Sequence, residues 1–163
     1  MRHLKLSARQ IAAKAGWTDV FIVPWNDPLL VTQTTNNTDQ QVVLDQLAFG
    51  DYVGYDVLGE IRTGFTGGSV DALVINLGVT GALTQFISSG ALITAGAVSV
   101  AAKTGYSEVA AGTPYCVPSG GKNLILNFDI TDAGHSLSQL TAGEFWVWMR
   151  IDRWGERPQV GDL

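Results

Sequence analysis

The sequence of 163 residues has little cysteine, little charge and no long apolar run. Cys116 is its only cysteine, which excludes a disulfide within the chain and fits synthesis in a reducing compartment. No apolar stretch approaches the roughly 20 residues that a membrane-spanning helix needs, and the charged start has no continuous apolar stretch behind it. We therefore expect neither membrane insertion nor a secretory signal. Charged residues make up only 15% of the chain, which indicates a surface that partners cover.

Basic charge is concentrated at the N-terminus. Residues 1–18 contain four basic and no acidic side chains, whereas the rest of the chain contains six basic and fifteen acidic ones. The acidic body would repel nucleic acid, so we expect none as a partner. The basic segment favours a tether to another protein, and a frayed end without a role is equally compatible. Within it, Ser7 to Gly16 are predicted to form a short helix with Ser7 as N-cap.

Glycine is abundant, with 19 residues, and β-branched and aromatic residues recur in short bursts between turn residues. This pattern is typical of short strands joined by tight turns. Strands are predicted at residues 19–24, 29–33, 42–47, 52–66, 70–77, 97–103, 122–131 and 143–152, with an irregular element at 84–88. We expect an all-β, antiparallel sandwich or jelly-roll of about eight strands. Its parts are a basic arm or short helix (1–18), the β-sandwich domain (19–152) and a C-terminal tail (153–163).

Two of these segments alternate clearly between apolar and other residues. The alternation predicts one inner sandwich face, because neighbouring side chains on a strand point to opposite sides. Its members are Leu124, Leu126, Phe128, Ile130, Phe145, Val147 and Met149. Trp146, Trp148 and Arg150 then lie on the opposite side, and Trp154 follows just beyond. Another segment of the chain, another subunit or a sugar ring could cover the tryptophans, and the low surface charge favours a protein interface.

Catalytic and metal-binding motifs are absent from the sequence. It has no G-x-S-x-G, H-E-x-x-H, C-x-x-C or Walker pattern, so we expect no enzyme. His135 lies near acidic residues, but nothing supplies a nucleophile or second nitrogen ligand, so a polar loop is favoured. Asp51, Asp56 and Glu60 match no calcium-loop spacing. We therefore predict no catalytic residue, no metal and no cofactor.

A longer pattern covers residues 50–152. It consists of D-V-L-G-E-I-R-T-G-F-T-G-G, then V-D-A-L-V-I-N-L-G-V-T-G-A-L-T-Q-F-I, then I-T-A-G-A-V, and finally L-T-A-G-E-F-W-V-W-M-R-I. This pattern resembles small structural proteins of tailed bacteriophages, in particular capsid decoration, or cement, proteins. The resemblance implies a β-sandwich that sits on the outside of a capsid, often as a trimer, and clamps neighbouring capsomers. The N-terminal helix and the C-terminal tail depart from that pattern.

The resulting expectation is a virion structural protein that binds itself and the major capsid protein. It would be made in the host cytoplasm and would end on the capsid surface. The expected interface residues are Trp146, Trp148, Arg150, Trp154, Leu4, Leu6, Arg9 and Ile11. The alternative is a carbohydrate-binding module of a tail or fibre that uses exposed tryptophans.

Overall fold

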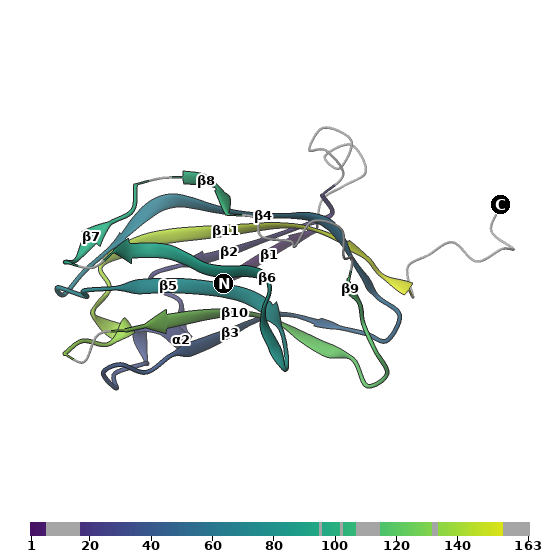
Figure 1. Ribbon diagram of the computed structural model, residues 1–163, viewed down its shortest axis with the longest axis horizontal. Coiled ribbons are helices and arrows are strands. Elements are labelled where there is room, and N and C mark those ends of the chain that lie inside the picture. The colour runs from purple at the N-terminus through teal and green to yellow at the C-terminus, as the bar shows by residue number, and fades with distance from the viewer. Residues whose placement is uncertain (6–16, 95, 102, 107–114, 132–133, 155–163) are drawn as a thin grey trace, which may run out of the picture.

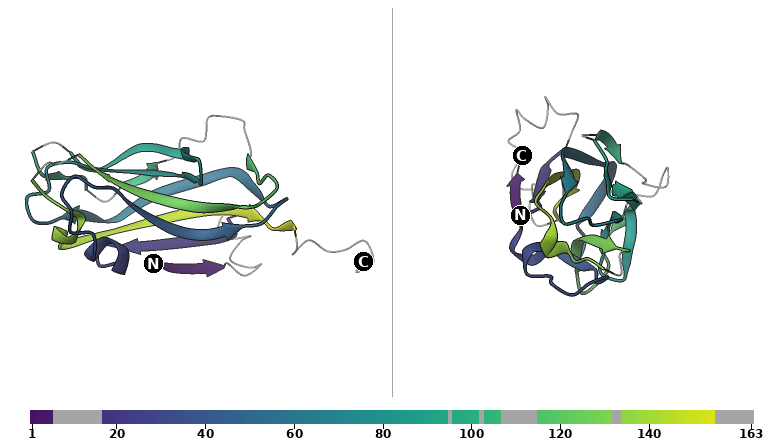
Figure 2. Two further views of the ribbon diagram at one scale, coloured as in Figure 1. Left: turned by 90° about the horizontal axis from the view of Figure 1, so that it is seen from below. Right: turned by 90° about the vertical axis from the view of Figure 1, so that its left-hand side faces the viewer.

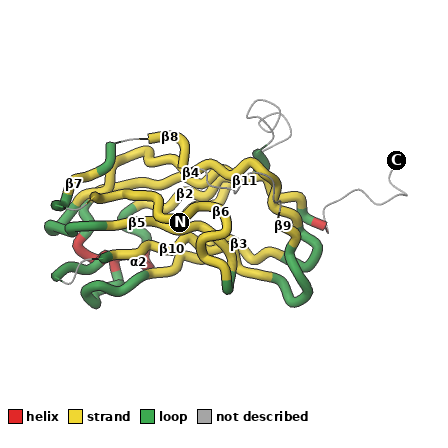
Figure 3. The backbone as a smooth tube through the Cα atoms, viewed as in Figure 1, coloured by secondary structure: helices red, strands yellow, loops and turns green. Residues whose placement is uncertain are grey.

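The protein folds as a β-sandwich of two antiparallel sheets (Figure 1). The computed structural model describes residues 1–5, 17–94, 96–101, 103–106, 115–131 and 134–154. No helix in these ranges is long and apolar enough to cross a membrane. The sandwich is long in the strand direction and compact when viewed end on (Figure 2). In the described ranges, helix is limited to short turns beyond the ends of strands (Figure 3).

One sheet has the strand order β1-β2-β11-β4-β8, and β9 also pairs with β4. Its strands are β1 (Arg2–Lys5), β2 (Asp19–Pro24), β4 (Tyr52–Thr66), β8 (Lys103–Tyr106), β9 (Tyr115–Cys116) and β11 (Ala142–Asp152). The other sheet has the order β3-β10-β5-β6-β7. Its strands are β3 (Gln40–Leu47), β5 (Leu73–Val79), β6 (Ala82–Thr94), β7 (Val98–Ser99) and β10 (Lys122–Ile130). The predicted all-β antiparallel sandwich is confirmed.

The core lies between the two sheets, and alternation along the strands selects its members. The inner face of β10 carries Leu124, Leu126, Phe128 and Ile130, and that of β11 carries Phe145, Val147, Met149 and Ile151; all are at most 3% exposed. Phe128 of one sheet meets Phe65 of the other, with ring centroids 6.0 Å apart. The predicted inner face is therefore correct, and its two segments belong to opposite sheets.

A glycine allows close contact beside this aromatic pair. Gly143 has φ +138°, a conformation that side chains rarely adopt, and a Cβ added there would lie 2.3 Å from the Phe65 ring. The backbone of β11 can therefore pass directly against Phe65 only because position 143 has no side chain.

Three local predictions were wrong. Residues 29–33 do not form a strand; Pro28–Val31 form the short helix α2, because the Asp27 side chain caps it by accepting from Leu29 N and Pro28 fits its first turn. The predicted irregular element at 84–88 is part of β6. The single strand predicted at 97–103 is replaced by β7 and β8, which pair in different sheets.

The basic arm begins as an ordered strand. Residues 2–5 form β1, which pairs antiparallel with β2 and places His3 opposite Phe21. The two rings stack with centroids 4.3 Å apart. An ion pair between the Met1 amine and the Asp27 carboxylate also joins this end to the body. The helix predicted from Ser7 to Gly16 lies outside the described residues.

Candidate functional site

The predicted tryptophan face is the outer side of the sheet that contains β11. Trp148 is only 8% exposed because indoles of the same chain flank it. Its ring centroid lies 5.3 Å from that of Trp17 and 5.6 Å from that of Trp146. Val20, Ile22 and Leu58 complete this second, smaller apolar cluster. Trp148 is thus covered within its own chain, by a residue just before β2 that the sequence analysis had not considered.

Acidic side chains fix the orientation of these indoles. Trp148 Nε1 donates to Glu60 Oε2 at 3.1 Å, and Trp146 Nε1 donates to Glu144 Oε1 at 2.7 Å. The Arg62 guanidinium lies over the Trp146 ring, 4.5 Å from its centroid, and also pairs with Glu60 at 3.2 Å. Such an arrangement combines cation–π attraction with charge-assisted hydrogen bonds. These contacts hold the Trp146 and Trp148 rings in fixed orientations. The two rings therefore do not form the open aromatic platform that the carbohydrate interpretation required.

A buried ionic cluster joins the two sheets near the end of β11. The cluster consists of His3, Asp19, Asp45 and Arg153. The Arg153 guanidinium binds both oxygens of Asp19, at 3.0 and 3.1 Å, and reaches Asp45 Oδ2 at 2.6 Å. His3 Nε2 lies 2.7 Å from Asp19 Oδ1. Asp19 is on β2 and Asp45 is on β3, so Arg153 bridges the two layers of the sandwich.

The electrostatics of this ionic cluster follow from its geometry. Burial of Asp19 raises its pKa, but hydrogen bonds from Arg153, Thr18 and His3 outweigh that effect and hold the pKa below its usual value. Burial lowers the pKa of Arg153, but its bonds to Asp19 and Asp45 raise it overall. His3, Asp19 and Asp45 also satisfy the spacing of a metal-ligand group among the described residues. Because Arg153 already binds both carboxylates, the ionic cluster is better suited to holding the two sheets together.

The first two residues after β11, Arg153 and Trp154, also contact the sandwich. Arg153 continues the inward parity of β11, and the Trp154 backbone N–H donates to Asp51 Oδ1 at 2.9 Å. The other Asp51 oxygen accepts from Ala48 N at 2.8 Å. Asp51 therefore connects the turn that follows β3 to the residues that follow β11. Glu60 binds Trp148 and Arg62, and the Asp56 side chain lies outside the described residues, so the three acids form no described calcium cluster.

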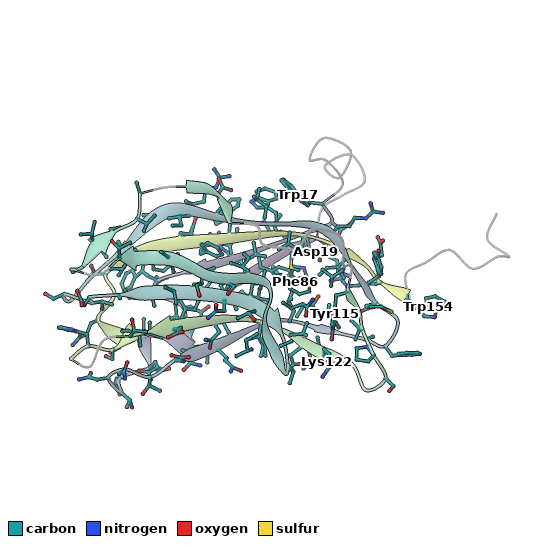
Figure 4. All side chains as sticks on the ribbon, viewed as in Figure 1. Trp17, Asp19, Phe86, Tyr115, Lys122 and Trp154 are labelled. Atoms are coloured by element: carbon teal, nitrogen blue, oxygen red, sulfur yellow. The ribbon has the colours of Figure 1, made fainter. Side chains whose placement is uncertain are left out.

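Exposed aromatic residues gather at this same end, which we call the aromatic end. Phe49 is 67% exposed and Trp154 is 59% exposed. Trp154 lies at this end of the sandwich (Figure 4), and its side chain is next to Gly50. They border a shallow hollow of about 430 Å³, which is lined by Phe49, Gly50, Tyr52, Cys116 and Trp154. Exposed apolar side chains grouped in this way mark contact sites more often than scattered ones do. Phe49 had not been predicted, because an isolated aromatic in a turn carries no periodic signal.

Among the remaining predicted interface residues, the structure describes only Leu4 and Arg150. Leu4 is half exposed on the edge strand β1. Arg150 faces outward, and its Nε is 3.5 Å from Asp152 Oδ1. Leu6, Arg9 and Ile11 lie outside the described residues. The tryptophan face and the aromatic end are therefore two separate places on the molecule.

The class that these features define is an antiparallel β-sandwich with an internally braced tryptophan face and an exposed aromatic end. No protein-family model, no curated protein and no solved structure matches the chain.

Proposed function

We propose that this chain is a virion structural protein, specifically a capsid decoration protein that associates with itself, as a trimer, and binds the outside of a capsid shell. The observation that carries the proposal is the exposed aromatic end, where Phe49 and Trp154 border an apolar hollow on an otherwise well-packed sandwich. Covering such apolar surface with a partner contributes a favourable free energy of roughly 25 cal/mol per Å² of area removed from water.

Two further observations support a structural role. The sequence over residues 50–152 resembles phage decoration proteins, and the β-sandwich that this resemblance implied is the fold observed. The tryptophan face is also braced by hydrogen bonds and by Arg62, so its large aromatic area stabilises the sheet. A protein that clamps a shell needs such a rigid body with contact surfaces at its ends.

The aromatic end is the part of this proposal that mutation can test. Phe49→Ser removes the most exposed aromatic side chain among the residues whose side chains are described. Val98→Ser is a matched control, since Val98 is 58% exposed on β7 at the opposite end of the sandwich (Figure 1). Both variants should keep Tm within about 1–2 °C of the parent, as surface changes usually do. We expect Phe49→Ser alone to lower the oligomer mass measured by analytical ultracentrifugation, or to weaken binding to purified shells that lack this protein.

The outcomes distinguish the proposal from its alternatives. Unchanged mass and unchanged shell binding in Phe49→Ser would refute the assignment of the contact to this end. Electron microscopy of the parent particle would refute the decoration role if it placed the chain in the tail. Binding of the pure protein to a glycan array, lost in Trp154→Ala and kept in Trp148→Ala, would favour carbohydrate recognition instead.

A further inference from the structure

Hydrogen bonds on several sides hold the turn that carries Phe49 at the aromatic end. Asp51 N donates to the Ala48 carbonyl at 3.1 Å, and Ala48 N donates to Asp51 Oδ2 at 2.8 Å, so the two ends of the turn bind each other. Gly50 N donates to the Val117 carbonyl at 3.1 Å, which joins the middle of the turn to the residue after β9. Phe49 is nevertheless 67% exposed. The turn therefore presents this ring to solvent from a well-fixed backbone.

The hollow beside Phe49 is large enough to hold an aromatic ring. Its volume is about 430 Å³, whereas a cavity of roughly 150 Å³ already takes up benzene. Phe49 forms one wall of the hollow, so its ring cannot also fill the hollow of its own copy. The sequence after Trp154 contains no aromatic residue that could do so. An aromatic ring that fills the hollow would therefore come from another molecule.

Charge favours a second copy of this chain as that molecule. The formal net charge is −5, so two copies need a contact surface that adds no further repulsion. None of the described residues that line the hollow is charged. The neighbouring Asp51 is only 4% exposed, and its two carboxylate oxygens accept from Ala48 N and Trp154 N. The described lining of the hollow therefore offers apolar contact without opposing a second copy by charge.

We propose that the hollow at the aromatic end receives the Phe49 ring of a second copy of this chain. Each copy then donates one ring and accepts one, and such a heterologous contact closes when it repeats around a symmetry axis. Because Phe49 and the hollow adjoin each other, the axis passes close to the aromatic end. This inference rests on the proposed self-association of the chain and names the surface that makes it.

The exposed ring area predicts a weak contact. An aromatic side chain has roughly 150–250 Å² of surface to bury, so the exposed parts of Phe49 and Trp154 provide roughly 200–300 Å² per copy. Covering this area on both partners stays below the roughly 1,200–2,000 Å² of a stable interface. Association should therefore depend on protein concentration, and copies held side by side on a shell should associate far better than copies in dilute solution.

Cys116 allows the hollow to be probed directly. It is the only cysteine of the chain, it is exposed, and it lines the hollow. The rate at which excess maleimide modifies Cys116 is measured from dilute to concentrated protein, together with the oligomer mass by analytical ultracentrifugation. In the parent and in the control Val98→Ser, modification should slow at least about threefold as the mass rises. In Phe49→Ser, the rate and the mass should stay those of the dilute parent.

A pair of variants tests whether the ring and the hollow fit each other. Cys116→Trp keeps Phe49 and fills the hollow with a bulky side chain, whereas Phe49→Ser keeps the hollow and removes the ring. At a concentration where the parent associates, each variant alone should sediment as a monomer, with a circular dichroism melt to show that it is folded. An equimolar mixture should form a heterodimer, because the Phe49 ring of one variant can enter the hollow of the other.

The outcomes separate this inference from the decoration role. A mixture that stays monomeric, or a Cys116 modification rate in the parent that does not change with concentration, overturns the inference. If Phe49→Ser then also loses binding to purified shells, the aromatic end faces the shell and the decoration role stands. If association depends on Phe49 but the parent does not bind shells, the inference stands and the decoration role fails.

Discussion

Replacing Arg153 by methionine is expected to destabilise the sandwich strongly. Methionine keeps the apolar stem of the side chain but removes the guanidinium that binds both oxygens of Asp19 and one of Asp45. Asp19 is fully buried and the Arg153 side chain is only 14% exposed. The change therefore leaves a buried carboxylate without its main partner and breaks the connection between the two sheets.

The magnitude follows from that geometry. Removing one partner of a buried ion pair typically costs about 3–5 kcal/mol. Because His3 and Thr18 still bind Asp19 in the variant, we expect a value near the lower end, about 3 kcal/mol. For a chain of this length that corresponds to a Tm lower by roughly 6–12 °C. Arg150→Met is the matched control: the Arg150 side chain is 49% exposed, and its pairing with Asp152 should contribute no more than about 1 kcal/mol.

The pH dependence gives an independent signature. The pKa of Asp19 is below its ordinary value of 3.8 in the folded parent, so its contribution to stability is present above pH 3.8 and is lost as the pH falls through the folded pKa. In Arg153→Met, burial is opposed by fewer hydrogen bonds, so the pKa of Asp19 rises. The stability difference between parent and variant should therefore be large at pH 7, and it should shrink as the pH falls from the raised pKa of Asp19 in the variant toward its lowered pKa in the parent.

Urea unfolding at pH 7 and at pH 3 measures both effects. If Arg153→Met costs less than 1 kcal/mol at pH 7, or if its cost equals that of Arg150→Met, the ionic cluster does not hold the sheets together. A cost that is large but independent of pH would show that the loss comes from the packing of the side chain and not from its charge.

Three further changes test the core and the tryptophan face by thermal and urea unfolding. Gly143→Ala should cost at least about 3 kcal/mol, because a Cβ would overlap the Phe65 ring, whereas Gly96→Ala, where no atom lies within 4 Å, should cost about 1 kcal/mol; equal costs would contradict the close approach at Gly143. Phe128→Ala should cost roughly 3–5 kcal/mol, and a loss below 1 kcal/mol would mean that its side chain is not in the core. Trp148→Ala should lower stability by about 3 kcal/mol or more, and an unchanged Tm would contradict its burial between two indoles.

Sequence periodicity predicted the sheets well, because a strand that is buried on one face has apolar residues at every second position. The inner residues of β10 and β11 could be assigned in this way, and the same parity places Val57 and Ile61 of β4 in the core. Helix α2 was missed because Leu30, its one buried residue, lies in a segment too short to show a period.

The functional features were harder to predict because they depend on contacts between distant residues. Trp17 and Trp148 are separated by most of the chain, so no local pattern shows that one covers the other. The signal for Arg153 was present, since it continues the inward parity of β11, but a charged residue at a strand end is usually assigned to solvent.

The three neighbouring indoles also give the protein an optical property. Chromophores whose centroids lie 5.3 and 5.6 Å apart couple their electronic transitions, so Trp17, Trp146 and Trp148 should produce a distinctive near-ultraviolet circular dichroism band. Trp154 belongs to the aromatic end, and the wavelength of its fluorescence emission should change when a partner covers it. One unlabelled sample would then carry two spectroscopic signals, one for the packing of Trp17 against Trp148 and one for contact at the aromatic end.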